Sequence, residues 1–113
     1  MADLDENASL EPQFCVHVDD AAGANGDVVV RLSGDLDIAG ADEARAVVDQ
    51  ALGQPRSRLT FDLTDLRFMD SSGIAVLVAA TQKVDTVTLR NPSPVIRRLL
   101  TIAGLVDIFV LTP

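Results

Sequence analysis

Segments with the two-residue apolar period of a β-strand alternate along this chain with segments that have the helical period of about 3.6 residues. The strand-like segments are residues 14–19, 27–33, 59–63 (with apolar residues continuing to Phe68), 86–90 and 106–111. The helix-like segments are residues 41–52 and 95–103, which have the helical period, and residues 73–82, which are apolar nearly all round. That last pattern suits a buried helix or a buried strand. Its abundance of Ala and Leu, and the Asp and Ser residues just before it, favour a helix that begins at Asp70–Ser72. This alternation predicts an α/β fold with a mainly parallel sheet of about five strands, an N-terminal antiparallel edge hairpin and about three helices.

Glycine and proline mark the ends of several of these segments. The run from Gly34 to Asp37 is predicted to break the second strand. Gly53 and Pro55 are expected to end the first helix, and Gly104 the last. Pro94 suits the first turn of that last helix.

The chain has 113 residues, 48% of them apolar, which suits a single domain with a substantial core. Residues 1–12 are polar and acidic and are expected to form a flexible tail, with the folded domain spanning 13–113. The N-terminus lacks the apolar segment of a signal peptide. The longest wholly apolar run, 74–80, is far shorter than the ~20 residues that cross a bilayer. We therefore expect a cytoplasmic protein that does not bind membranes.

Acidic residues outnumber basic ones, 17 to 9, and the formal net charge is −8. A nucleic-acid-binding protein needs clustered Lys and Arg, and the only close pair in a helix-like segment is Arg97-Arg98. The charge therefore argues against a nucleic-acid partner. It fits either a role in solubility alone or a partner with a basic surface.

Cys15 and His17 are the only residues of their types. The apolar neighbours of Cys15, Phe14 and Val16, predict a small buried side chain that forms no internal disulfide. Nothing points to a metal site or a cofactor. His17 is the only histidine that could activate a serine nucleophile, and no hydrolase or phosphate-loop motif occurs. We therefore predict no catalytic residues and no enzymatic activity.

Ser71 lies where a strand is predicted to end and a helix to begin, in the run from Asp70 to Gly73. The carboxyl ends of parallel strands are where ligands and partners usually bind. One interpretation is that Ser71 or Ser72 only caps the helix, which is worth ~1 kcal/mol. The other is that Ser71 is a target of modification. Position alone leaves both open.

A phosphate on Ser71 would add a charge of about −1.5 to −2. The helix dipole favours an anion there by ~0.3–1 kcal/mol. The negative charge of Asp70 would repel the phosphate, and the charges of Asp35 and Asp37 would do the same if their loop is adjacent. We expect the fold to survive, whereas a docked partner would bury an unpaired charge at a cost of several kcal/mol. One modification could therefore switch off binding without unfolding the domain.

Three runs of residues carry a resemblance to a known family. They are 32–37 (LSGDLD), 61–73 (FDLTDLRFMDSSG) and 91–100 (NPSPVIRRLL), the last followed by AGL at 103–105. Together they resemble the STAS domain and, more narrowly, the bacterial anti-sigma factor antagonists. The resemblance covers nearly everything after residue 13, and its most specific part is the run FMDSSG at 68–73.

The resemblance implies a protein that binds a serine-kinase anti-sigma factor of the histidine-kinase-like ATPase fold, and so frees a sigma factor to join RNA polymerase. The kinase would use ATP and magnesium to phosphorylate Ser71, with Ser72 as the alternative acceptor. The phosphorylated form would dissociate, and a PP2C-type phosphatase would restore it. The chain would thus be a substrate in a bacterial stress-response cycle.

The expected partner-binding surface combines the family's Gly-Glu/Asp-Leu-Asp loop, the serine-bearing corner and the turn after the fourth strand. Its residues are Asp35, Asp37, Met69, Asp70, Ser72, Gly73, Val76, Asn91 and Ser93. We expect a monomer or a weak dimer. The helix after the motif is expected to be about one turn, ~5 Å, shorter than is usual in the family, which bears on which kinase is recognised.

Two other functions stay open. An unswitched STAS scaffold or transporter-associated subunit would share the fold, but no kinase would label its Ser71. A small nucleotide-binding or hydrolysing domain is the other alternative, although no phosphate loop supports it. Titration with ATP and GTP would distinguish this third function.

Overall fold

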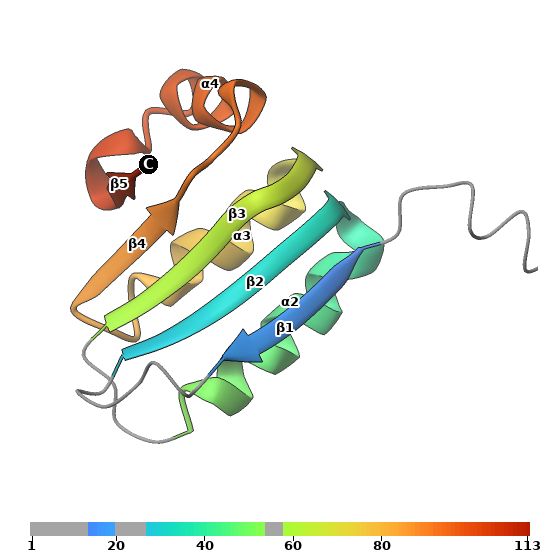
Figure 1. Cartoon of the computed structure of the whole chain (residues 1–113), viewed down its shortest axis with the longest axis vertical. Coiled ribbons are helices and arrows are strands. Elements are labelled where there is room, and N and C mark those ends of the chain that lie inside the picture. Colours follow the sequence, from blue (N-terminus) through green and yellow to red (C-terminus); the bar gives the residue numbers. More distant parts are fainter. Residues whose placement is uncertain (1–13, 20–26, 54–57) are drawn as a thin grey trace, which may run out of the picture.

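The five strands of this chain form one sheet whose order, β1-β2-β3-β4-β5, follows the sequence (Figure 1). The computed structural model describes residues 14–19, 27–53 and 58–113. The strands are β1 (Cys15–Asp19), β2 (Asp27–Leu36), β3 (Arg58–Met69), β4 (Thr86–Arg90) and β5 (Val110–Thr112). The helices are α2 (Ile38–Ala51), α3 (Ser71–Ala80) and α4 (Pro94–Ile102), with a short 3-10 helix, η1 (Val106–Ile108).

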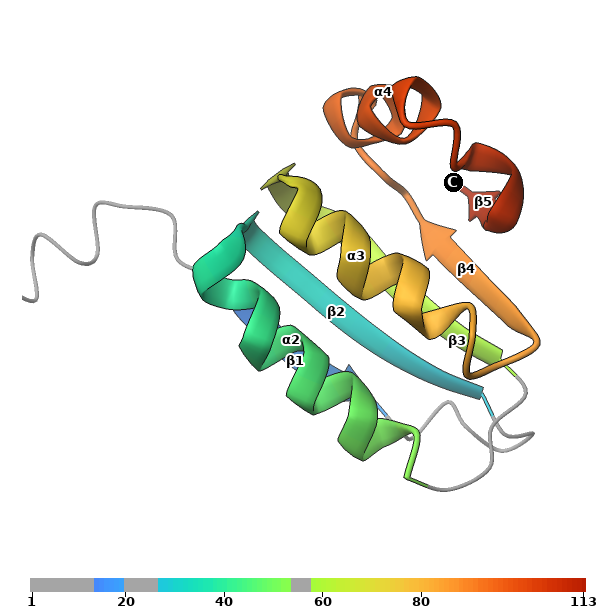
Figure 2. The same ribbon diagram turned by 180° about the vertical axis from the view of Figure 1, so that it is seen from behind.

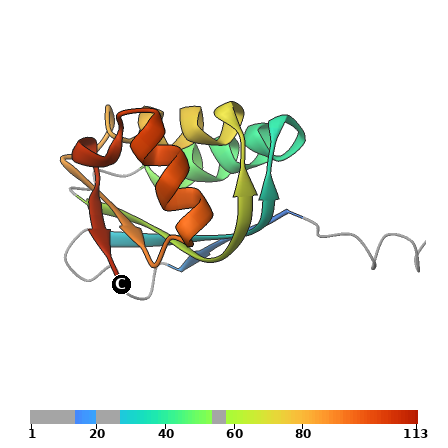
Figure 3. The ribbon, with the colours of Figure 1, turned by 90° about the horizontal axis from the view of Figure 1, so that it is seen from above.

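The pairing of the strands confirms the predicted fold class. β1 runs antiparallel to β2, and the pairs β2–β3, β3–β4 and β4–β5 are parallel. Because crossover connections share one hand and the strands follow one another across the sheet, every helix is expected on the same face. Figures 2 and 3 show α2, α3 and α4 on one face of the sheet, with the opposite face left open by them.

The core lies between the helices and the sheet face that they cover. Alternate residues of β2 and β3 point into it, as the two-residue period predicts. α3 is apolar nearly all round, and its buried residues pack beneath it onto the sheet. The largest fully buried side chains are Phe61, Leu32, Leu36, Leu59, Leu63, Leu66, Met69, Leu77, Leu89, Ile96, Leu100 and Val28.

The second strand is longer than predicted. It does not break at Gly34 but continues to Leu36, and α2 begins at Ile38 rather than at Ala41. Gly34 has a φ of 85°, and the register with β3 shifts between Gly34 and Asp35. The glycine therefore makes an irregularity inside the strand. Pairing with β3 resumes beyond it, which is a tertiary effect that the local turn signal cannot reveal.

The last predicted strand is only half correct, since residues Val106–Ile108 form η1 and β5 spans Val110–Thr112. β4 is five residues long, and β5 pairs only with its last three, Thr88 to Arg90.

Val95 belongs to the predicted apolar stripe of the last helix, yet 54% of this residue is exposed, which is more than that place implies.

Cys15 is exposed, so its predicted burial is wrong. Successive side chains of a strand point to opposite faces. In β1, Val16 and Val18 pack against the core, which leaves Cys15 and His17 on the open face. The predicted tail at 1–12 lies outside the described residues. None of the helices in the described ranges has the length and hydropathy needed to span a bilayer.

Candidate functional site

Two strand-to-helix corners lie side by side at the carboxyl ends of β2 and β3. Leu36, the last residue of β2, pairs in register with Met69, the last residue of β3. The backbone amide of Asp70 donates a hydrogen bond to the carbonyl oxygen of Leu36 at 3.2 Å. α2 and α3 consequently begin next to each other, at the same edge of the sheet (Figure 2).

Asp70 caps the helix that begins at Ser71. Its Oδ1 accepts hydrogen bonds from the amides of Ser72, at 2.8 Å, and Gly73, at 3.3 Å. The interpretation that Ser71 or Ser72 caps this helix is therefore wrong, because an aspartate already holds that position. Ser71 is exposed, and its hydroxyl makes no hydrogen bond within the described ranges. The hydroxyl is thus free to meet an incoming enzyme.

Gly73 lets α3 start directly against the sheet. A Cβ atom at this position would lie 2.7 Å from Cγ of Met69 and 2.8 Å from Cγ of Leu36, both closer than real contacts allow. Both neighbours are fully buried, so neither can move aside at little cost. The glycine therefore fixes the helix start, and with it the position of Ser71 two residues earlier.

Asp35 and Asp37 lie at the neighbouring corner, as the resemblance implies. Asp37 caps α2, with Oδ1 accepting from the amides of Ala39 at 3.0 Å and Gly40 at 3.3 Å. Oδ1 of Asp35 is buried and has no hydrogen-bond partner among the described residues. A buried acceptor without a partner costs free energy, and natural proteins rarely keep one without a reason. A donor supplied by a docked molecule would remove this cost.

Three of the predicted partner-binding residues lie beneath the surface, which corrects their role. Met69 and Val76 are 0% and 2% exposed, and Gly73 is also buried. The side chains of Met69 and Val76 cannot touch a partner while the domain stays folded, and Gly73 has no side chain to offer. They instead hold the corner in place, whereas Asp70 and Ser72 are only partly buried.

Asn91 lies apart from the two corners. β4 ends opposite Asp62, while β3 continues to Met69. Nδ2 of Asn91 donates to Oγ1 of Thr64 at 3.3 Å. Thr64 precedes Met69 by five residues, which is roughly 16 Å along β3 at ~3.3 Å per residue. Ser93 caps α4 by accepting from the amide of Ile96 at 3.2 Å. Ser93 therefore has a structural role of its own.

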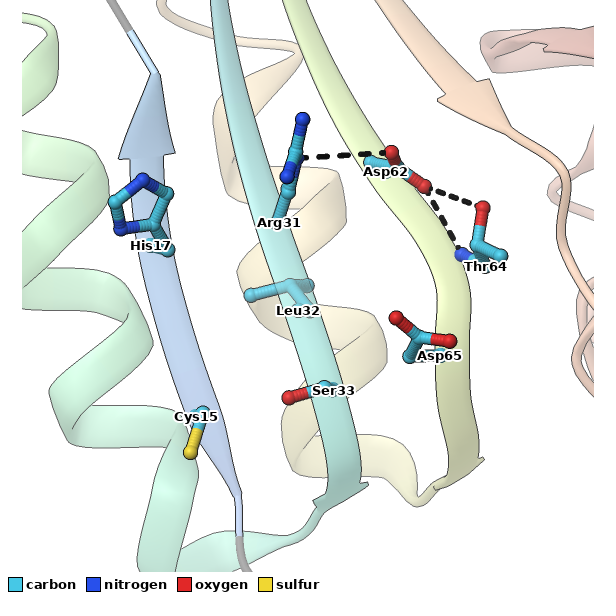
Figure 4. A pocket seen from close by; sticks show the side chains of 8 residues that line it. All are labelled: Cys15, His17, Arg31, Leu32, Ser33, Asp62, Thr64 and Asp65. Atoms are coloured by element: carbon cyan, nitrogen blue, oxygen red, sulfur yellow. Dashed lines mark hydrogen bonds and ion pairs between the residues drawn. The ribbon is translucent and has the colours of Figure 1, made fainter.

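A second polar cluster lies on the open face of the sheet. Successive registers place His17, Arg31, Asp62, Arg90 and Thr112 in one row across all five strands. Asp62 accepts from the hydroxyl of Thr64 at 2.6 Å and from its amide at 3.1 Å. It also pairs with Arg31 at 3.9 Å and Arg90 at 3.7 Å. Figure 4 shows Asp62 between Arg31 and Thr64.

The charges and hydrogen bonds of this row change the titration of Asp62. Burial disfavours the carboxylate, but the hydrogen bonds from Thr64 and the charges of Arg90 and Arg31 outweigh burial. They hold the pKa of Asp62 below its ordinary value of 3.8. A hollow of about 320 Å³ adjoins the row and also includes Cys15, Ser33 and Asp65 (Figure 4). No group of three metal-ligating side chains occurs in the described part of the chain.

Residues 20–113 match the family model of the STAS domain. A relative from Lysinibacillus sphaericus, an anti-sigma F factor antagonist, is 34% identical over 83 residues, which cover 69% of this chain and 71% of that protein. The similarity in sequence therefore extends over most of both chains.

Three solved structures share the fold. An anti-sigma factor antagonist from Mycobacterium paratuberculosis superposes with a TM-score of 0.79 at 25% identity, covering 89% of this chain and 86% of that one. The antagonist SpoIIAA in its unphosphorylated form gives a TM-score of 0.72 at 25% identity, with 89% of each chain covered. The phosphorylated form of SpoIIAA from Bacillus gives 0.65 at 25% identity, covering 89% of this chain and 92% of that one.

Proposed function

Because the chain belongs to the STAS domain family, and within it to the anti-sigma factor antagonists, we propose that it binds a serine-kinase anti-sigma factor and that phosphorylation of Ser71 by this kinase ends the binding. Binding would free a sigma factor, and a PP2C-type phosphatase would reset the switch. The observation that carries this proposal is the exposed Ser71 hydroxyl, which makes no hydrogen bond with any residue that the structure describes, because Asp70 caps the helix.

The fold can accept a phosphate at this position. Ser71 is the first residue of α3, where the helix dipole favours an anion by ~0.3–1 kcal/mol. The carboxylates of Asp70 and Asp37 cap the two adjacent helices and would repel the new charge. Because the residue is exposed, water screens this repulsion. We therefore expect the phosphorylated domain to stay folded.

A docked kinase could not accept the same phosphate. Closing an interface over Ser71 would bury the added charge between two aspartate-capped corners, where neither Asp37 nor Asp70 forms an ion pair with a described residue. Burying an unpaired charge costs several kcal/mol. A loss of ~2.7–4.1 kcal/mol already weakens binding about 100- to 1000-fold.

Two further observations support the proposal. SpoIIAA, whose fold this chain shares, is itself solved in both an unphosphorylated and a phosphorylated form. The buried Oδ1 of Asp35, which has no partner within the described part of the chain, lies at the corner next to Ser71, where a donor from a bound partner would satisfy it. The proposed function therefore combines a modifiable hydroxyl with an acceptor for which the described residues supply no donor.

The test is to incubate the purified chain with candidate anti-sigma factor kinases, ATP and magnesium, and to locate the phosphate by peptide mass spectrometry. We expect one phosphate, on Ser71. Ser71→Ala should abolish labelling, while the matched variant Ser72→Ala should still be labelled. Labelling of Ser72 alone would overturn the assignment. Labelling of neither serine by any kinase would favour an unswitched scaffold.

A further inference from the structure

Ile38 is the most exposed large hydrophobic residue of the described ranges. The exposed set is Ile38 at 75%, Phe68 at 45%, Val95 at 54%, Ile102 at 73%, Ile108 at 44% and Val110 at 49%. Scattered apolar side chains on a surface are normal and require no explanation. What distinguishes Ile38 is its place in the fold.

Ile38 occupies in α2 the position that Ser71 occupies in α3. The two corners read Leu36-Asp37-Ile38 and Met69-Asp70-Ser71, and in each the aspartate caps the helix that follows. Leu36 and Met69 are register partners, so α2 and α3 start beside each other at the same edge (Figures 1 and 2). Packed helices lie about 8–10 Å apart, which sets the scale of their separation.

The fold itself does not require an isoleucine at this position. The buried residues of α2 are Gly40, Ala41, Ala44 and Val48, and Ile38 is not among them. A β-branched side chain gives no advantage at a helix start, where Asp37 already supplies the cap. Phe68 is also partly exposed at this edge, where it pairs in register with Asp35.

We infer that Ile38 is an apolar anchor, which inserts into a pocket of the anti-sigma factor kinase when the kinase docks over Ser71. This inference rests on the function proposed above. Asp37 and Asp70, which cap the two helices, lie on the same two corners as this anchor, and Asp35 lies near the end of β2. The complementary surface is therefore an apolar socket with hydrogen-bond donors or cations at its rim. Buried apolar anchors of this kind carry much of the binding energy of protein interfaces.

The test compares two isoleucines that are equally exposed. Ile38→Ser and Ile102→Ser remove the same side chain, at 75% and 73% exposure. Ile102 lies at the C-terminal end of α4, which leads away from α3 toward β5 (Figure 1). The probe is the purified kinase that labels Ser71. The two readouts are the dissociation constant of the complex between this kinase and each variant, and the melting temperature of each variant alone.

We expect Ile38→Ser to weaken binding about tenfold or more, with an unchanged melting temperature. Ile38→Leu should stay close to the wild type, and Ile102→Ser should bind normally. If wild type binds the kinase and Ile38→Ser binds equally well, or if Ile102→Ser loses as much, the anchor is overturned and the proposed function stands. If no kinase binds or labels the wild-type chain, both the anchor and the proposed function are overturned.

Discussion

The backbone amide of Asp70 donates a hydrogen bond to the carbonyl oxygen of Leu36 at 3.2 Å. This bond joins the end of β3 to the end of β2, at the point where each strand leads into a helix. It brings the acidic corner of Asp35 and Asp37 beside the corner that presents Ser71. The proposed switch would therefore act at one edge of the sheet, where we expect a charge to be added without disturbing the core.

Replacing Gly73 with alanine should destabilise the domain. Alanine is intrinsically better than glycine in a helix by roughly 0.5–1 kcal/mol. Here the added Cβ would lie 2.7 Å from Met69 and 2.8 Å from Leu36, and overpacking of a core costs about 1–3 kcal/mol. Urea unfolding should show a net loss for Gly73→Ala. A gain in the free energy of unfolding would contradict the close approach of α3 to the sheet.

Asp70→Ala should lower the free energy of unfolding by about 1 kcal/mol, because the amides of Ser72 and Gly73 lose their acceptor. Asp70→Ser should retain most of the stability, since serine is also a good cap. Asp37→Ala is the matched change at the start of α2, with a similar expected loss. If Asp70→Ala unfolds like the wild type, Asp70 is not the cap.

Asn91 has a φ of 53°, in the left-handed region that favours glycine. Asn91→Gly and Asn91→Ala both remove the hydrogen bond to Thr64, so the difference between them isolates the backbone. We expect Asn91→Gly to be more stable than Asn91→Ala by about 1 kcal/mol. Thermal unfolding monitored by circular dichroism measures this difference, and equal stabilities would contradict the backbone conformation.

Stability should fall in acid partly because of Asp62. The pKa of its carboxyl lies below 3.8 in the folded state, so its contribution is fully present above the unfolded value and is lost as pH falls through the folded value. The free energy of unfolding of wild type minus that of Asp62→Asn should therefore be positive at about pH 6 and shrink toward about pH 2. A difference that does not change with pH would show that the hydrogen bonds from Thr64 and the ion pairs with Arg90 and Arg31 contribute no such stability.

Local patterns predicted most of the fold. The alternating residues from Thr86 to Arg90 match β4, and Pro94 occupies the first turn of α4, as proline's geometry favours. The prediction that a helix starts at Asp70–Ser72 is confirmed, with Asp70 as the cap. These features depend on neighbours in sequence, which is why sequence alone reveals them.

The features that sequence did not reveal depend on pairing between strands. The continuation of β2 past Gly34 requires β3 beside it, and the row through Asp62 requires the register of all five strands. The exposure of Cys15 depends on which sheet face the helices cover. The site was predicted at Ser71 and its acidic neighbours. The buried positions of Met69 and Val76, and the exposed Ile38, appear only once the helices are packed.

The most direct test is the dissociation constant of the cognate kinase for the unmodified chain and for the chain fully phosphorylated on Ser71, measured by calorimetry with circular dichroism of both forms. We predict that phosphorylation weakens binding at least 100-fold while the two spectra and melting temperatures stay alike. Equal affinities, or a loss of binding that comes with loss of the fold, would contradict a switch that acts at the surface alone.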